Sequence, residues 1–265
     1  MANIDDIKRL RAATGAGISD CKRALEETSD DYDEAVKWLR EKGLSGAAKR
    51  SDRENTQGAV AVATSGDAAA IVELKCETDF VAKSPDFVKL VNELAEQVAA
   101  DGEDAAAKRA ADVADLNVTL KENIALGRIV RFDAAPGAVL DTYLHVQNGR
   151  GVNAVLVEVT GGSRELAHDV AVHIAFAKPD YLRREDVPAD RIEEERATLE
   201  AQTRNEGKPE AAIPKIVDGK LNGFFKAVPG GVLLEQPFTK DDKQSVAQAL
   251  GGATVTRFAQ VIIGG

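Results

Sequence analysis

The sequence predicts an α+β protein built from small antiparallel sheets and separate helices. Hairpin patterns and helical stripes occupy different stretches, the order hairpin then helix occurs twice, and a charged helical pair interrupts the second copy. With 265 residues, 44% of them hydrophobic, the chain can bury a sizeable core. We expect an N-terminal unit with its linker over residues 1–54, a first core subdomain over 55–134, a second over 135–178 and 228–265, and an insertion over 179–227.

Charge and composition exclude several classes of protein. A net charge of −10 argues against general affinity for nucleic acid or anionic membranes, because that affinity depends on clustered Lys and Arg. No apolar run approaches the roughly 18 residues of a membrane span, and the first residues carry no apolar signal core. We therefore expect a cytoplasmic protein without direct nucleic-acid or membrane partners. Cys21 and Cys76 lack paired spacing, which predicts small buried side chains and neither a disulfide nor a zinc site.

The first 44 residues predict a compact unit of three helices. Apolar residues three or four apart mark a first helix from Ile4 and a third from Tyr32. The second helix is expected to start at Ser19 or Asp20, whose side chains are suited to an N-cap. Gly43 is expected to close the third helix.

The connection between the first two helices is a candidate docking patch. Gly15 and Gly17 allow a tight turn there, which would direct Ile18 outward beside Arg11. A lone Gly-x-Gly between helices is not a nucleotide fingerprint, because that motif has a third glycine and follows a strand. Residues 45–57 have the composition of a linker.

Beyond this linker the chain repeats the same order of elements. Each copy has a hairpin, an amphipathic helix and a later closing strand, so we expect two related α+β subdomains with antiparallel sheets and helices on one face. The matching positions are the hairpin openings Gly58 and Gly137, the helix starts Ser84 and Ser163, and the Arg-Phe pairs at 131–132 and 257–258.

The segment between the first hairpin and its helix carries an aromatic residue that the core does not need. Residues 76–84 are expected to form a loop, with Ser84 as a hydroxyl cap and Pro85 at the first helical position. The following helix has a complete apolar stripe without Phe80. Two interpretations are open: Phe80 and Val81 staple this helix to its sheet, or the ring contacts a partner.

The second copy makes the same crossing with fewer residues, which favours a partner contact for Phe80. Ser84 follows Leu74 by ten positions, whereas Ser163 follows Val159 by four. A fold that closes with two glycines in one copy does not need the longer segment in the other. The added residues therefore indicate function and not architecture.

An inserted antiparallel helical hairpin is expected over residues 179–227. Pro188 begins its first helix, residues 206–209 break it, and a return helix carries an apolar stripe that ends at Phe224. Residues 191–196 are too polar to be buried on more than one narrow face, so the hairpin should protrude. It is either a solvated stalk or an arm for self-association or partner docking.

The sequence contains no motif for enzymatic chemistry. It lacks a Gly-x-Ser-x-Gly nucleophile elbow and a glycine-rich loop ending in Gly-Lys-Ser/Thr, so we expect neither an enzyme nor a cofactor. His168 and His173 are five residues apart, about 140° around a helix, and no metal site is expected. His145 follows two apolar residues near a hairpin turn. It is either an exposed contact or an ordinary hydrogen-bonded histidine.

Two motifs closely resemble the signatures of bacterial translation elongation factor Ts. They are Thr-Gly-Ala-Gly at 14–17, continuing as Asp-Cys-Lys-Arg-Ala-Leu at 20–25, and Thr-Asp-Phe-Val-Ala-Lys at 78–83. The resemblance extends over almost the whole chain. It implies a ubiquitin-associated-like N-terminal domain, paired core subdomains and a helical hairpin.

The resemblance also implies a function, guanine-nucleotide exchange on elongation factor Tu, the GTPase that delivers aminoacyl-tRNA to the ribosome. In the family, the loop matching Thr78, Asp79, Phe80 and Val81 enters the nucleotide-binding domain of the GTPase. The aromatic residue wedges between helices near the Mg²⁺ and phosphate site, the metal is displaced, and GDP leaves. Asp79 would support the loop or its contact.

Further partner contacts follow from the same resemblance. Arg11, Ile18 and Ser19 match positions that grip another helix of the nucleotide-binding domain, although some relatives have an apolar residue where this chain has Ser19. His145 matches a histidine that touches a further domain of the GTPase. Two rival functions are an adaptor for peptides or ubiquitin-like partners and an enzyme of unknown type, which would need a polar pocket.

Overall fold

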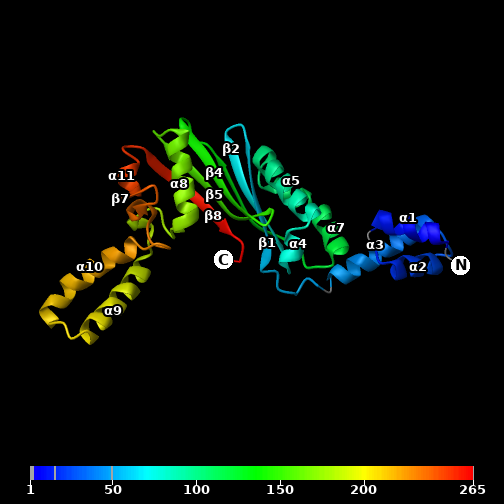
Figure 1. The fold of residues 1–265 in the computed structure, drawn as a ribbon, viewed down its shortest axis with the longest axis horizontal. Coiled ribbons are helices and arrows are strands. Elements are labelled where there is room, and N and C mark those ends of the chain that lie inside the picture. Colours follow the sequence, from blue (N-terminus) through cyan, green and yellow to red (C-terminus); the bar gives the residue numbers. More distant parts are fainter. Residues whose placement is uncertain (1–2, 15, 49, 265) are drawn as a thin grey trace.

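Two three-stranded antiparallel sheets pack face to face at the centre of the molecule, and α5 (Pro85–Asp101) and α8 (Arg164–Ala177) cover their outer faces (Figure 1). The computed structural model describes residues 3–14, 16–48 and 50–264. The first sheet has the order β1-β2-β3, with bounds Gln57–Ser65, Ala68–Cys76 and Ala125–Asp133. The second has the order β4-β5-β8, with bounds Ala138–Gln147, Arg150–Thr160 and Thr254–Ile262. The prediction of an α+β fold with paired antiparallel sheets is confirmed.

The central strands bury both of their faces. Alternate side chains of β2 and β5 pack against a helix, and the side chains between them meet the other sheet, as the period of two along a strand requires. The helix-facing residues are Ala70, Val72 and Leu74 on β2 and Val155, Val157 and Val159 on β5. The shared layer between the sheets contains Val60, Ala69, Ile71, Ala154, Leu156 and Val261. The sequence predicted the helix-covered faces but not that the second face of each sheet covers the other sheet.

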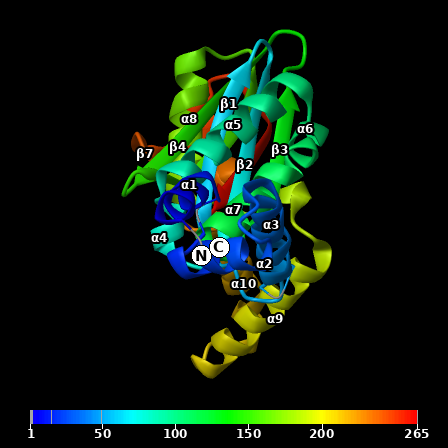
Figure 2. The ribbon, with the colours of Figure 1, turned by 90° about the vertical axis from the view of Figure 1, so that its right-hand side faces the viewer.

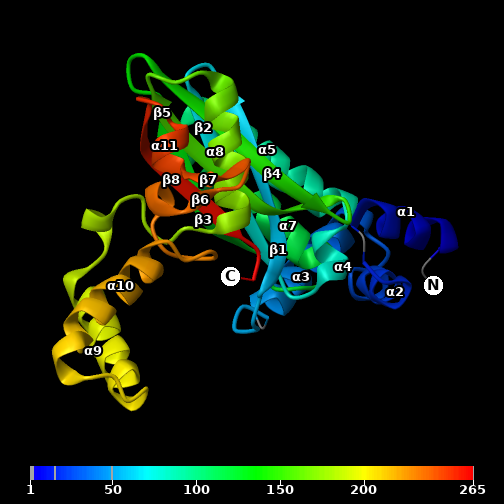
Figure 3. The ribbon, with the colours of Figure 1, turned by 60° about the vertical axis from the view of Figure 1, so that its left-hand side comes forward.

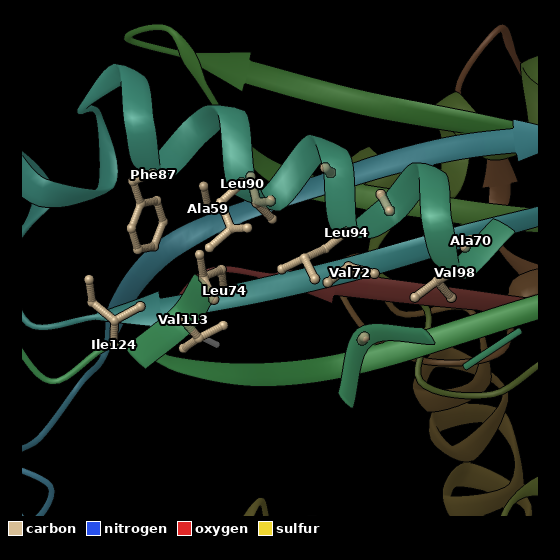
Figure 4. Packing of buried hydrophobic residues seen from close by; sticks show 14 of the residues in the cluster. Ala59, Ala70, Val72, Leu74, Phe87, Leu90, Leu94, Val98, Val113 and Ile124 are labelled. Atoms are coloured by element: carbon tan, nitrogen blue, oxygen red, sulfur yellow. The ribbon is translucent and has the colours of Figure 1, made fainter. Parts of the chain in front are cut away.

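The first sheet is covered by α5 (Pro85–Asp101), whose stripe points at β2 (Figure 4). Phe87, Leu90, Leu94 and Val98 are buried in this cluster. The predicted helix start is confirmed, but the Ser84 hydroxyl makes no hydrogen bond within the described part of the chain. After α5 come α6 (Asp104–Lys108) and α7 (Ala110–Leu120), which return the chain to β3.

A matching irregularity in the two sheets supports their relationship. The pairing of β2 with β3 shifts register beside Glu73, and the pairing of β5 with β8 shifts beside Glu158. Both glutamates are buried. Glu73 accepts a hydrogen bond from the backbone of Arg128 at 2.9 Å, and Glu158 accepts one from the Arg257 guanidinium at 2.9 Å. Each copy therefore has a bulge at the same place, with a carboxylate that satisfies groups on the closing strand.

Three helices lie together at the N-terminus (Figure 2). Their buried side chains form a small core of their own. They are α1 (Ile4–Thr14), α2 (Ile18–Glu27) and α3 (Tyr32–Ala48). Cys21 lies in this core and Cys76 in the core under α5, so both are buried side chains with free thiols, as predicted. The predicted start of the second helix was late by one or two residues, because Gly17 is the N-cap and Ile18 is already helical.

The prediction that Gly43 closes the third helix is wrong. The helix continues to Ala48, so the predicted linker over 45–57 begins later. A Cβ atom at Gly43 would lie 2.5 Å from Cγ1 of Val118, which shows that this glycine allows α3 to approach α7 closely. Gly17 has φ −63°, a conformation open to any residue, so the α1–α2 turn does not require a glycine there. Gly15 lies outside the described residues.

The inserted hairpin projects away from the sheets (Figure 3). It consists of α9 (Ala189–Asn205) and α10 (Ile213–Phe225), with the 3-10 turns η1 (Arg184–Asp186) before it and η2 (Glu210–Ala212) between the helices. Leu199, Val217 and Phe225 are buried between the arms. Phe225 thus takes the buried place that the sequence assigned to Phe224, which is only partly buried. Projection fits both a stalk and a docking or self-association arm, so both remain predictions.

A buried polar chain connects the second core to the base of this hairpin. His173 of α8 (Arg164–Ala177) is fully buried, and its Nδ1 accepts the backbone N–H of Thr239 at 3.2 Å. Its Nε2 therefore carries the proton and donates to Oε1 of Gln236 at 3.0 Å. Gln236 in turn donates to the carbonyl of Ala227 at 2.9 Å and to that of Gly230. The remaining elements of this region are η3 (Leu233–Glu235), β6 (Pro237–Phe238), β7 (Asp241–Ser245) and α11 (Val246–Ala249).

Acid should weaken the fold through this histidine. Burial lowers the pKa of His173 below its ordinary value, so between that ordinary value, about 6.5, and the lower folded value the unfolded chain binds a proton that the native chain does not. The free energy of unfolding should therefore fall as pH decreases through this window, by at most about 1.4 kcal/mol per pH unit. Denaturant titrations at about pH 7.5 and 5.5 measure the slope, and His173→Gln should flatten it. An unchanged slope in that variant would assign the acid sensitivity to other groups.

Candidate functional site

Phe80 stands exposed on a short helical turn between β2 and α5. Its side chain is 81% accessible, the most exposed large hydrophobic side chain of those described. The sequence predicted a loop here, but residues Asp79–Ala82 form α4, a single turn. The difference arises because Thr78 acts as an N-cap, its Oγ1 accepting the backbone N–H of Val81 at 3.3 Å. We call residues 78–83 the Phe80 turn.

Val81 and Ala82, which follow Phe80, anchor the turn. Ala82 is completely buried, and Val81 is partly buried against the core of the first sheet. The staple interpretation therefore holds for Val81 and fails for Phe80. The ring is left without a structural task in the core.

An ion pair spans the exposed side of the turn. Lys83 donates to the carboxylate of Asp79 one helical turn away, and the Lys83 ammonium lies 5.7 Å from the centroid of the Phe80 ring. This hydrogen bond holds the pKa of Asp79 below its usual range. Asp79 is thus charged at neutral pH, and its partner lies beside the aromatic ring.

The base of the turn is held by a segment more than forty residues away in sequence. Oε2 of Glu122 accepts the backbone N–H groups of Glu77 and Thr78, each at 3.0 Å, and Oε1 accepts the Thr78 hydroxyl. Oε1 of Glu77 accepts the backbone N–H of Asn123 at 2.7 Å. We call Glu77, Glu122 and Asn123 the clamp. Sequence reasoning missed all three, because no motif or periodicity connects the end of β2 with the start of β3.

Cys76 directly precedes Glu77 of the clamp, and its thiol is unreactive. Burial raises the pKa of its thiol to about 12, and Sγ donates to the carbonyl of Thr78 at 3.2 Å. A thiol with this pKa is protonated at neutral pH and is a poor nucleophile. It serves as a further support for the turn.

The N-terminal candidates gather at the adjoining ends of α1 and α2. Arg11 is in the last turn of α1, and Ile18 and Ser19 begin α2. All three are exposed, Ile18 at 57%. The predicted outward placement of Ile18 is confirmed. These residues belong to a different unit from Phe80, so the structure provides two separate surfaces.

His145 is exposed near the end of β4, beside an apolar surface. It borders an open hollow of about 630 Å³, lined also by Tyr143, Val172 and Phe176. The Phe176 side chain is 67% exposed on α8. The sequence analysis did not identify Phe176, because this residue lies outside the apolar stripe of α8 and its position is typical of an ordinary surface residue. The interpretation of His145 as an exposed side chain is the one that the structure supports.

The candidate residues Phe80, Ile18 and His145 are exposed side chains on packed supports. None of their His, Cys, Asp and Glu side chains form a group of three or more that could hold a metal ion. None of the helices that the structure describes has the length and apolar character to cross a bilayer. Fold and site together define an α+β protein with exposed side chains that project from a packed scaffold.

Comparison with known proteins identifies the family. Residues 77–265 match the family model described as "Elongation factor TS". The chain is 44% identical over 281 aligned positions to elongation factor Ts of Clavibacter michiganensis subsp. michiganensis, covering 100% of both chains. It is 46% identical over 265 positions to that of Renibacterium salmoninarum (94% and 93% covered) and 44% identical over 280 to that of Mycobacterium ulcerans (100% and 99%). The chain belongs to the elongation factor Ts family and is a protein of translation elongation.

Proposed function

We propose that this chain is a guanine-nucleotide exchange factor for elongation factor Tu, and that Thr78–Val81 promote GDP release by displacing Mg²⁺. The observation that carries the proposal is Phe80, exposed at 81% on a capped turn that Val81 and Ala82 anchor to the core. The partner is elongation factor Tu in its GDP-bound and nucleotide-free forms. The factor acts in the cytoplasm, where elongation takes place, and catalyses no chemical step.

The geometry of the turn supports a wedge. Phe80 projects while Val81 and Ala82 fix the backbone beneath it, so the ring can enter an apolar gap in the GTPase without disturbing the factor's own core. Displacing Mg²⁺ removes the cation that neutralises the GDP phosphates, and GDP then dissociates more easily. Asp79, paired with Lys83, keeps the turn in shape.

One ring does not supply the whole effect. Burying a phenylalanine side chain contributes about 1.5–3 kcal/mol, whereas a nucleotide held at nanomolar affinity is bound by about 12 kcal/mol. The whole interface must therefore stabilise the altered nucleotide site. By linkage, factor binding weakens GDP binding and GDP weakens factor binding by the same ratio.

Two further surfaces would supply that interface. We assign Arg11, Ile18 and Ser19 to a grip on the nucleotide-binding domain, and His145, with Phe176 beside it, to a contact with a further domain of the GTPase. The division of the chain at residues 54, 134, 178 and 227 also remains a prediction. Separate apolar clusters in the N-terminal helices and in the hairpin support it.

The rate of labelled GDP release from purified elongation factor Tu, with and without this chain, tests the function. Acceleration at substoichiometric amounts supports exchange. An unchanged rate contradicts it and favours the adaptor, whereas turnover of a small molecule would favour an enzyme.

Two exposed isoleucines of the N-terminal unit offer a matched test of its surface. Ile18→Asp should weaken capture of nucleotide-free elongation factor Tu by about tenfold or more, because it places a charge where an apolar contact is proposed. Ile4, exposed at 67% in the first turn of α1, is the control, and Ile4→Asp should leave the dissociation constant unchanged. Titration by fluorescence or calorimetry measures both. Equal behaviour of the two variants would remove Ile18 from the interface.

A further inference from the structure

The clamp has a role beyond closing a turn. We propose that Glu122 is a positioning residue for nucleotide exchange, which holds the Phe80 turn in the orientation that the ring needs when it meets the GTPase. This inference rests on the proposed function. Glu122 itself contacts Glu77 and Thr78, not Phe80, so it acts through the backbone.

Glu122 makes three hydrogen bonds to the base of the turn with one carboxylate. Two come from consecutive backbone N–H groups, those of Glu77 and Thr78, and the third comes from the Thr78 hydroxyl. Hydrogen bonds to an ionised acceptor are stronger than neutral ones. The Thr78 hydroxyl oxygen also accepts the N–H of Val81, so the carboxylate orients the cap of α4 as well as its entry.

The carboxylate is itself presented by a rigid segment. Lys121 has φ 61°, the left-handed conformation that ends α7 and turns the chain toward β3. The Asn117 side chain then bonds Ile124 twice, with Oδ1 accepting its N–H at 2.8 Å and Nδ2 donating to its carbonyl at 2.8 Å. The Ile124 side chain is buried in the core under α5. Glu122 therefore has little freedom to follow a moving turn.

The clamp also holds the chain that arrives from the N-terminal unit. The Asn123 amide donates to the backbone carbonyls of Ser51 at 3.0 Å and Arg53 at 2.7 Å. The Arg53 guanidinium lies 3.5 Å from the Glu77 carboxylate. Glu122 thus holds the Phe80 turn, while Asn123 and Glu77 next to it hold the incoming chain.

A single helical turn needs such support. Four residues of helix are not stable alone, because one turn gains too few hydrogen bonds for the dihedral angles that it fixes. Val81 and Ala82 anchor only the C-terminal side of α4. Without Glu122 the N-terminal side would keep only the weak bond from the Cys76 thiol to the Thr78 carbonyl. The partner would then have to order this side during binding, which costs free energy at the step where the ring must be placed.

The test is the maximal rate of GDP release from elongation factor Tu at saturating factor, measured separately from the factor concentration at half-maximal rate. Glu122→Ala should lower the maximal rate about tenfold. Glu122→Gln should fall between it and the wild type, because the amide oxygen can still accept the two backbone N–H groups. Glu96→Ala is the matched control, an exposed glutamate on α5, and should behave as wild type. If Glu122→Ala does not fold, Glu122→Gln carries the comparison.

A double-mutant cycle separates positioning from a general structural role. If Glu122 acts through Phe80, Glu122→Ala should cause no further loss in a Phe80→Ala background. Additive losses, or a wild-type maximal rate in both Glu122 variants, overturn the inference. If the wild-type chain does not accelerate GDP release, the proposed function itself fails, and if Phe80→Ala is as active as wild type, the proposed wedge fails. A slow Phe80→Ala beside normal Glu122 variants refutes only the role of Glu122.

Discussion

Replacing Phe80 with alanine is expected to slow factor-stimulated GDP release from elongation factor Tu by about 10- to 150-fold, the rate equivalent of the 1.5–3 kcal/mol contributed by a buried phenylalanine. The free energy of unfolding should change by no more than about 0.5 kcal/mol, because the ring is exposed and packs on no core residue. Stopped-flow release of a fluorescent GDP analogue and denaturant unfolding measure the two quantities.

Phe87→Ala is the opposite control on the same segment. Phe87 lies in the first turn of α5 and is fully buried against the first sheet, so its truncation should cost about 3–5 kcal/mol of stability. The wedge proposal fails if Phe80→Ala exchanges nucleotide at the wild-type rate. It also fails if that variant loses cooperative unfolding, since the ring would then belong to the core.

Replacing Gln236 with alanine should produce the largest loss of stability among the polar residues. Its side chain is fully buried, accepts from His173 and donates toward the carbonyls of Ala177, Ala227 and Gly230. Truncation would leave a cavity and several buried groups without partners, which should lower the free energy of unfolding by about 3–5 kcal/mol. Denaturant titration measures the loss.

Gln202→Ala is the control for that experiment, because Gln202 is exposed on α9 and its replacement should be nearly neutral. Should Gln236→Ala be as stable as this control, the polar chain at the base of the hairpin would have no energetic importance. The region would then be held by apolar packing alone.

Local patterns predicted the elements well, and contacts between distant segments escaped them. The openings at Gly58 and Gly137 and the helix starts at Ser84 and Ser163 are set by neighbouring residues, so the sequence located them. Gly43 was misread because a glycine that ends a helix and one that admits a second helix are the same residue in sequence.

In the candidate site, too, features set by adjacent residues could be predicted and contacts between distant segments could not. Phe80 could be found because the apolar stripe after it is complete without it, a property of adjacent residues. Glu122 could not, because its carboxylate reaches the base of the turn only after α5, α6 and α7 have brought the chain back. The resemblance to elongation factor Ts supplied the partner, which no spacing of residues encodes.

The shared layer between the two sheets has a mechanical consequence. Ile71 and Leu156 lie in one close-packed stratum, so the copy that carries Phe80 and the copy that carries His145 cannot slide apart without opening a void. The distance between the Phe80 turn and His145 is therefore held constant by the packed core. If a partner binds at both points and its surface does not match this distance, the less rigid of the two proteins must change shape. In the proposed complex we therefore expect the factor to keep its dimensions and the GTPase to change shape.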